Sequence, residues 1–259
     1  MAAEPLIVIV GETASGKSAL AMDLAKRFDG EIICADSRTV YKDMDIGTAK
    51  PSKLDQKKIP HYLLDIIEAG QPFTVAEFKR LAHEAIQDIS KKGKLPIMVG
   101  GSGLYVDSVI FDYQFSEKSR SKDPKNPRHL KPNPDHGLDK KLRPNTLIIG
   151  LKLDRDELQK RITKRVGQMF SNGLIDEAKN LGNKYGWEIE VLKTPGYKAL
   201  RRYLNNELNV TEAKELFIRS DMQLAKKQRT WFKRNNSIQW VSDPIKAVDL
   251  ATTFLNKLQ

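Results

Sequence analysis

The residues from Gly11 to Ser18 carry the clearest chemical pattern in the chain. They read Gly-Glu-Thr-Ala-Ser-Gly-Lys-Ser and fit the spacing G-x-x-x-x-G-K-[ST] of a loop that binds phosphate groups. Glycines let such a loop fold so that successive backbone N–H groups face one anion, and the following helix adds the partial positive charge of its N-terminus. Lys17 supplies a positive charge to a phosphate, and the hydroxyl of Ser18 can hold Mg²⁺.

Asp36 is the second residue whose type and position suit chemistry. The apolar run 31–35 predicts a strand that ends at Asp36, and ligands of open parallel sheets bind beyond the carboxyl ends of the strands. Asp36 therefore falls beside the phosphate loop, where a carboxylate can accept a proton or hold Mg²⁺. Many nucleotide hydrolases carry a Mg²⁺-binding Asp after a later apolar strand, but the run 95–99 ends in two glycines instead. That difference argues against an ATPase, although small-molecule kinases vary here.

The elements that flank the phosphate loop support it. Residues 6–10 are apolar and β-branched, as in a buried parallel strand, and residues 19–28 have the apolar spacing of a helix. A glycine turn that only caps a helix is the alternative. The succession of strand, loop and helix disfavours that alternative, so the sequence predicts a protein that binds a phosphorylated ligand.

Strands and helices alternate along most of the chain, which predicts an α/β fold with a P-loop-type parallel sheet flanked by helices and further helices at the C-terminal end. A capping box at Thr74 starts one helix. The long helix 211–234 shows an apolar stripe and an opposite basic face. Its stripe consists of Ala213, Phe217, Ser220, Leu224 and Trp231, and its basic face of Arg219, Lys226, Arg229 and Lys233. Further strands are expected at 61–67, 95–99, 146–153 and 238–241.

Three regions are expected along the chain. Residues 1–116 form the first part of the catalytic core, and residues 146–259 form the rest of the core with the C-terminal helices. Between them, residues 117–145 are rich in Lys, Arg, Pro, Asn and Asp and are expected to form a mobile basic loop.

Composition narrows the classes of partner. The formal net charge of +11 suits a polyanionic partner, although charge alone is weak evidence. No apolar run approaches the roughly twenty residues of a membrane span, and no secretory signal is evident, so a cytoplasmic protein is expected. The single cysteine, Cys34, fits a reducing compartment and a buried position, and the four histidines lack metal-ligand spacing.

Several blocks occur in one order and together resemble the tRNA dimethylallyltransferases, enzymes that prenylate the adenosine on the 3′ side of the anticodon. The blocks are 11–18, Asp36-Ser37-x-x-Val40-Tyr41, Met44-Asp-Ile-Gly-Thr-Ala-Lys-Pro51, Gly100-Gly-Ser-Gly-Leu-Tyr105 and Gln223-Leu-Ala-Lys-Lys-Gln-x-Thr-Trp231. The resemblance spans about 5–110 and 146–242, and the block 44–51 beside Asp36 is far more specific than the phosphate loop.

This resemblance implies that the phosphate loop holds the diphosphate of dimethylallyl diphosphate, with Mg²⁺ at Ser18, and that Asp36 is the general base. Thr13 then lies on the substrate channel and joins Asp36 and Lys17 as a catalytic residue. The implied diphosphate-binding residues are Gly11, Glu12, Thr13, Ala14, Ser15, Gly16, Lys17, Ser18 and Lys193. The implied tRNA-binding residues are Asp36, Ser37, Arg38, Thr39 and Ser102. The expected partners are the anticodon stem-loop of tRNA and dimethylallyl diphosphate, with no membrane, and we expect a monomer.

The chain departs from the family pattern in three places. The stretch 117–143 replaces a helical insertion that grips the anticodon stem-loop. Arg38 and Thr39 replace a Met-Gln pair, and Met222 stands where an Arg is frequent. Two other functions therefore stay open: an adenylate isopentenyltransferase that acts on free AMP, ADP or ATP, and a non-catalytic protein that binds RNA or nucleotides.

Overall fold

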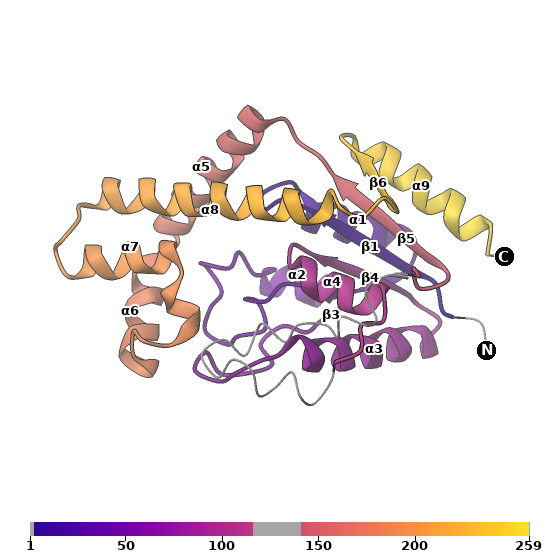
Figure 1. The fold of residues 1–259 in the computed structure, drawn as a ribbon, viewed down its shortest axis with the longest axis horizontal. Coiled ribbons are helices and arrows are strands. Elements are labelled where there is room, and N and C mark those ends of the chain that lie inside the picture. Colours follow the sequence, from indigo (N-terminus) through magenta and orange to yellow (C-terminus); the bar gives the residue numbers. More distant parts are fainter. Residues whose placement is uncertain (1–2, 116–140, 259) are drawn as a thin grey trace.

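A six-stranded, all-parallel sheet forms the centre of the computed structural model, which describes residues 3–115 and 141–258. The strand order is β3-β2-β4-β1-β5-β6 (Figure 1). The strands are β1 (Leu6–Gly11), β2 (Gly30–Cys34), β3 (His61–Tyr62), β4 (Leu95–Gly100), β5 (Thr146–Leu151) and β6 (Ile238–Val241). The predicted α/β fold with a parallel sheet is confirmed.

Helices follow most strands, as the alternation in the sequence predicts. They are α1 (Lys17–Arg27), α2 (Lys53–Lys58), α3 (Val75–Lys91), α4 (Gly103–Ile110), α5 (Arg155–Ser171), α6 (Leu174–Tyr185), η3 (Glu190–Lys193), α7 (Pro195–Leu204), α8 (Val210–Phe232) and α9 (Pro244–Asn256). The capping box is present at the start of α3, where Thr74 and Glu77 bond each other's backbone N–H groups.

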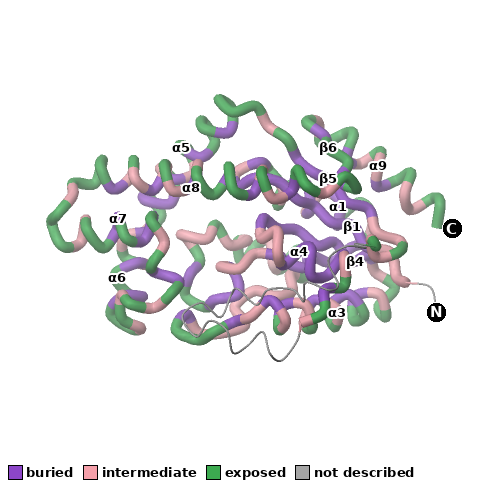
Figure 2. The backbone as a smooth tube through the Cα atoms, viewed as in Figure 1, coloured by how far each residue is buried: buried purple, intermediate pink, exposed green. Residues whose placement is uncertain are grey.

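The centre of the sheet is buried on both faces, so β1, β4 and β5 are largely apolar (Figure 2). One apolar cluster joins the sheet to α1 and α9, and the other joins it to α3, α4, α5 and α8. Cys34 lies in the first cluster, and burial raises the pKa of its thiol to about 12. The predicted buried position of Cys34 is confirmed.

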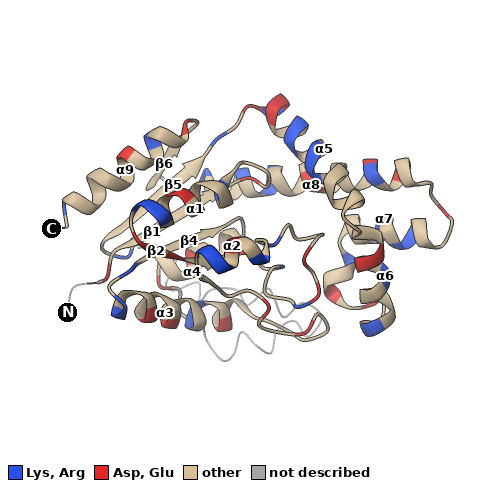
Figure 3. Ribbon diagram, turned by 180° about the vertical axis from the view of Figure 1, so that it is seen from behind, with Lys and Arg blue, Asp and Glu red and all other residues tan. Residues whose placement is uncertain are grey.

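The helices α5, α6, α7 and α8 lie together beyond the carboxyl ends of the strands, and α8 extends from this group back over the sheet (Figure 1). Basic side chains recur along α5, α7 and α8 (Figure 3). This arrangement places the C-terminal helices next to the loops that follow β1, β2 and β4, where the sequence predicts the site.

The structure corrects one predicted strand and adds two short helices, α2 and η3. The strand predicted over 61–67 ends at Tyr62, because Leu63 and Asp65 adopt left-handed backbone angles with φ of 64° and 54°. The short helix α2, capped by the side chain of Ser52, was not predicted. Residues 117–140 of the predicted basic loop 117–145 lie outside the described residues. Among the described helices, none is long and apolar enough to cross a bilayer.

Candidate active site

The phosphate loop joins β1 to α1 in the conformation that its sequence predicts. Gly16 has φ +97°, in the left-handed region that favours glycine, and Lys17 begins the helix. The Nζ of Lys17 donates to the carbonyl oxygen of Glu12 at 2.6 Å, so the side chain curls back over the loop. Burial lowers the pKa of Lys17 to about 8, an effect that Asp36 opposes and Arg165 adds to. The charge of the Lys17 ammonium therefore depends partly on the carboxylate of Asp36.

A cavity of about 320 Å³ opens beside this loop, and we call it the P-loop cavity. Its loop-derived lining consists of Thr13, Ala14, Gly16, Lys17 and Ser18. A second cavity, of about 420 Å³, lies between the loops after β2 and β4 and the helices α7 and α8, and we call it the α7–α8 cavity. Both cavities are lined by Asp36, Arg38, Gly47, Thr48, Gly101, Asp221, Leu224 and Gln228.

Asp36 stands where these two cavities meet. Its Oδ1 accepts the backbone N–H of Arg38 at 2.8 Å, which orients the carboxylate in the turn after β2. The backbone N–H of Ser37, which lies between Asp36 and Arg38, donates to Oγ of Ser102 at 2.9 Å. This bond ties the turn after β2 to the start of α4. A carboxylate placed between an anion cavity and a second, partly apolar cavity can accept a proton from a group bound in the second one.

Helix α8 contacts the phosphate loop through Gln228 and Arg229. The side chain of Gln228 accepts the backbone N–H of Thr13 at 2.7 Å and donates to the carbonyl oxygen of Gly101 at 3.1 Å. One turn of α8 therefore links the loop after β1 to the loop after β4. Beside it, Arg229 binds both carboxylate oxygens of Glu12, at 2.6 and 3.1 Å.

The block 44–51 is held from the other side by α6. The carboxylate of Glu177 accepts three consecutive backbone N–H groups, those of Asp45, Ile46 and Gly47, at 2.8, 2.6 and 2.9 Å. The hydroxyl of Tyr197 donates to the same carboxylate at 3.0 Å, and a Cβ at Gly47 would collide with that hydroxyl. These contacts fix Gly47, which lines both cavities.

Lys50 anchors the other end of the block. Its side chain is 2% exposed, and its Nζ pairs with Asp45 at 2.6 Å and Asp65 at 2.5 Å. These contacts give a structural reason for the specific sequence of the block 44–51, because they fix the wall that the block contributes to both cavities.

Most of the predicted residues line one of the two cavities, and four of them line neither. Lys17, Ser18 and Thr13 line the P-loop cavity with Asp36 and Thr39, and Ser37, Arg38 and Ser102 line the α7–α8 cavity with Asp36. Neither of these cavities is lined by Gly11, Glu12, Ser15 or Lys193. Glu12 turns toward Arg229, and Lys193 is exposed in η3.

The predicted faces of the long C-terminal helix are partly wrong. Ala213 and Phe217 are buried, whereas Ser220 and Trp231 are only partly buried and Leu224 is 44% exposed. All of these residues except Ala213 line the α7–α8 cavity. The apolar periodicity identified side chains on one face of α8, but it could not show that part of this face lines a cavity. Arg229, predicted on the basic outer face, instead binds Glu12, because α8 crosses directly over the phosphate loop.

Four residues of the site were not predicted for their roles. Gln228 lies in the block 223–231 on which the family resemblance partly rests. That block marked the segment as important, but the sequence could not show which residues Gln228 contacts. Glu177, Arg165 and Asp221 carry no local pattern; each meets its partner across a large separation in sequence.

Comparisons with known proteins point to one family. The family model for IPP transferase matches residues 39–135 and 124–235. A protein of Anoxybacillus flavithermus named tRNA dimethylallyltransferase is 38% identical over 279 aligned positions, which cover 92% of this chain and 90% of that protein. The alignment is longer than the part of this 259-residue chain that it covers, so the relative has residues without a counterpart here.

Two solved structures share the fold. The tRNA isopentenylpyrophosphate transferase of Bacillus halodurans superposes with a TM-score of 0.82 at 33% identity and covers 98% of each chain. The corresponding enzyme of Staphylococcus epidermidis gives a TM-score of 0.82 at 32% identity, with 99% of this chain and 100% of that chain covered. The phosphate loop, Asp36 and the block 44–51 lie within this common fold, and the chain belongs to the tRNA dimethylallyltransferase family.

Proposed function

We propose that this protein transfers the dimethylallyl group of dimethylallyl diphosphate to the exocyclic N6 amine of an adenosine in tRNA and releases diphosphate. The observation that carries the proposal is the position of Asp36, which lines both the P-loop cavity and the α7–α8 cavity. The donor diphosphate occupies the first cavity and the adenine enters the second. The relatives named tRNA dimethylallyltransferase support tRNA over a free nucleotide as the acceptor.

The reaction is a substitution at the first carbon of the allyl group. The bond from this carbon to the diphosphate oxygen breaks as the bond to N6 forms, and the diphosphate leaves with the electron pair. Lys17 and the loop N–H groups stabilise the departing charge. The lone pair of an adenine amine is delocalised into the ring, so Asp36 assists by accepting the N6 proton as the new bond forms.

The finer assignments follow the resemblance. We propose that the target is the adenosine on the 3′ side of the anticodon, presented by the anticodon stem-loop and taken out of its stack. Ser37, Arg38, Thr39 and Ser102 contact the RNA around it. The enzyme acts as a monomer in the cytoplasm, which sedimentation and fractionation can test.

Ser18 suits a magnesium ion bound together with the diphosphate. It is exposed at the first turn of α1 and lines the P-loop cavity. The described residues contain no group of three or more His, Cys, Asp or Glu side chains that could hold a metal ion, so phosphate oxygens and water would complete the shell, as Mg²⁺ prefers. When bound, Mg²⁺ would neutralise charge on the leaving diphosphate.

The test is transfer of label from dimethylallyl diphosphate to unmodified tRNA and, separately, to AMP. We expect label in tRNA only, dependent on Mg²⁺ and abolished by chelation. Asp36→Asn should lower kcat by about 10²- to 10⁴-fold, because an amide cannot accept the proton. It should leave the affinity for inorganic diphosphate within about twofold of the wild-type value, since the loop that binds the diphosphate is intact.

Asp23→Asn is the matched control, because it removes an exposed carboxylate of α1 that pairs only with Arg27 among the described residues. Label in AMP alone would identify an adenylate isopentenyltransferase. Label in neither acceptor would identify a non-catalytic binding protein.

A further inference from the structure

Glu12 is an acidic residue inside a loop whose pattern binds anions. Its side chain is 5% exposed, and its backbone carbonyl accepts a hydrogen bond from Nζ of Lys17 at 2.6 Å. Burial is the largest influence on the pKa of Lys17 and lowers it, and the carboxylate of Glu12 is among the smaller influences that raise it. The acid therefore lies within electrostatic reach of the lysine. A carboxylate that paired with Lys17 would compete with a bound diphosphate for the same charge.

Arg229 of α8 holds this carboxylate. Its Nε and Nη2 donate to the two oxygens of Glu12 at 2.6 and 3.1 Å, the paired geometry in which a guanidinium binds a carboxylate most strongly. The hydrogen bond to Glu12 is also the largest influence on the pKa of Arg229, and it raises that pKa. The arginine side chain is 37% exposed, so Glu12 is the buried partner and depends on the arginine for its counter-charge.

The ion pair lies beside the P-loop cavity without lining it. Neither Glu12 nor Arg229 lines the P-loop cavity or the α7–α8 cavity, whereas their chain neighbours Thr13 and Gln228 both line the P-loop cavity. Arg229 therefore keeps the carboxylate outside the space that a diphosphate would fill.

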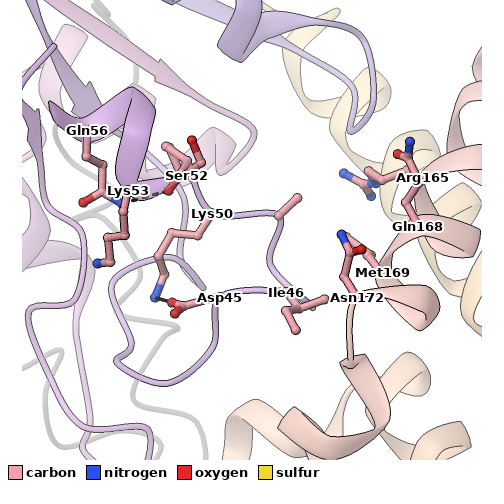
Figure 4. A pocket seen from close by; sticks show the side chains of 12 residues that line it. Asp45, Ile46, Lys50, Ser52, Lys53, Gln56, Arg165, Gln168, Met169 and Asn172 are labelled. Atoms are coloured by element: carbon pink, nitrogen blue, oxygen red, sulfur yellow. Dashed lines mark hydrogen bonds and ion pairs between the residues drawn. The ribbon is translucent and has the colours of Figure 1, made fainter. Parts of the chain in front are cut away.

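Two further cations near the P-loop cavity already pair with carboxylates. A third cavity, of about 360 Å³, adjoins it between α5 and the segment that leads into α2, and Arg165 lines both. Figure 4 shows Arg165 and Lys50 on opposite sides of this third cavity; Arg165 pairs with Asp221 and Lys50 with Asp45, each at 2.6 Å. Within the described part of the chain, Nζ of Lys17 pairs with no carboxylate and donates to a backbone oxygen instead. The charge of Lys17 thus stays available to an incoming anion, provided that no carboxylate reaches it.

We propose that Arg229 is a positioning residue for the donor site: it binds Glu12 and so keeps that carboxylate from neutralising Lys17. This inference rests on the proposed function, since it concerns the loop that should receive the donor diphosphate. It also explains how a phosphate loop can carry an acid at its second position.

The test measures the binding of inorganic diphosphate with Mg²⁺ by calorimetry. Arg229→Gln should weaken binding by about tenfold, because Glu12 without its guanidinium would pair with Lys17. Adding Glu12→Gln to this variant should restore the affinity to within about threefold of the wild-type value, since the charge that needed a partner is gone. Arg229→Lys should lie between the wild-type protein and Arg229→Gln, because the charge remains while the paired geometry is lost.

Lys226→Gln is the matched control. It removes one positive charge from an exposed position of the same helix, three residues before Arg229, and should bind diphosphate as the wild-type protein does. The two single variants should bind unmodified tRNA equally, because each lowers the net charge by one. If Arg229→Gln bound tRNA more weakly than Lys226→Gln and diphosphate normally, Arg229 would be an RNA contact and the inference would be overturned.

A purely structural ion pair predicts a different pattern. The double variant would then bind diphosphate no better than Arg229→Gln, and that result in folded proteins would overturn the inference. If Arg229→Gln fails to fold, Arg229→Lys decides: weaker binding that Glu12→Gln restores would support the inference, and unchanged affinity would overturn it. A wild-type protein that does not bind diphosphate would overturn the proposed function itself.

Discussion

The charge of Lys17 depends on its burial in the phosphate loop. Burial lowers its pKa to about 8, so the free protein loses this positive charge as the pH rises through that value. We expect the dissociation constant of inorganic diphosphate, taken relative to that of a Lys17→Arg variant, to be level below pH 8 and to rise above it, by up to about tenfold per pH unit. Calorimetric titrations between about pH 6.5 and 9.5 measure this.

Lys17→Arg serves as the control for that titration. A guanidinium keeps its charge throughout this range, and diphosphate itself titrates equally in both experiments. The break near pH 8 should therefore be absent from the variant. Equal pH profiles for the two proteins would contradict the assignment of the break to Lys17.

Single residues of the site divide into those that the sequence predicts and those that only the fold assembles. Lys17 and Ser18 belong to a short pattern between a strand and a helix, and Asp36 follows a strand, so local rules place all three. Arg165 and Asp221 meet from separate helices, and no spacing along the chain reports that contact.

Helix α8 is expected to support the donor site through Gln228. Gln228→Leu removes the acceptor of the Thr13 N–H and the donor to the Gly101 carbonyl. We expect a loss of about 1–3 kcal/mol in the free energy of unfolding and an increase of about tenfold in KM for the prenyl donor. Urea unfolding and steady-state kinetics measure the two effects.

Thr230→Ala is the comparison for this helix. The Thr230 hydroxyl bonds only within α8 among the described contacts, so its removal should leave KM unchanged. If Gln228→Leu lowers stability and leaves KM at the wild-type value, then α8 supports the fold without shaping the loop.

Helix α6 should control the block 44–51 in a similar way. Glu177→Gln replaces one acceptor oxygen with an NH₂ group that faces backbone donors, so the three N–H groups from 45 to 47 cannot all be satisfied. We expect a loss of about 1.5–3 kcal/mol in the free energy of unfolding and a lower kcat/KM, because Gly47 and Thr48 line both cavities.

Asp176→Asn changes the exposed neighbour of Glu177 and should alter neither quantity. A stable Glu177→Gln protein with normal kcat/KM would show that the block holds its shape without the carboxylate.

The secondary structure followed from the sequence more fully than the packing. Caps and apolar periodicity located α3, α5, α6 and α8 to within a few residues. The insertion of β4 between β2 and β1 depends on long-range pairing, which local patterns do not encode. For the same reason the predicted stripe of α8 was right for Phe217, which is buried, and wrong for Leu224, which is 44% exposed.

The molecule as a whole carries a formal net charge of +11, and this charge should govern binding of tRNA more than binding of the small donor. Neutralising about five phosphates would give a plot of log association constant against log salt concentration with a slope of about −4. Filter binding or fluorescence anisotropy of unmodified tRNA at several salt concentrations measures the slope. A slope near zero would mean that the basic surface does not contact the RNA backbone.

The bonds from α8 to the phosphate loop also bear on how the protein is made. Thr13 and Gln228 are 215 residues apart, and Glu12 and Arg229 are 217 apart. During synthesis the phosphate loop emerges first. Its contacts with Gln228 and Arg229 can form only after nearly the whole chain has been made. A nascent or prematurely terminated chain that stops before Gln228 therefore lacks a finished donor pocket, so incomplete copies should not sequester the prenyl donor from the finished enzyme.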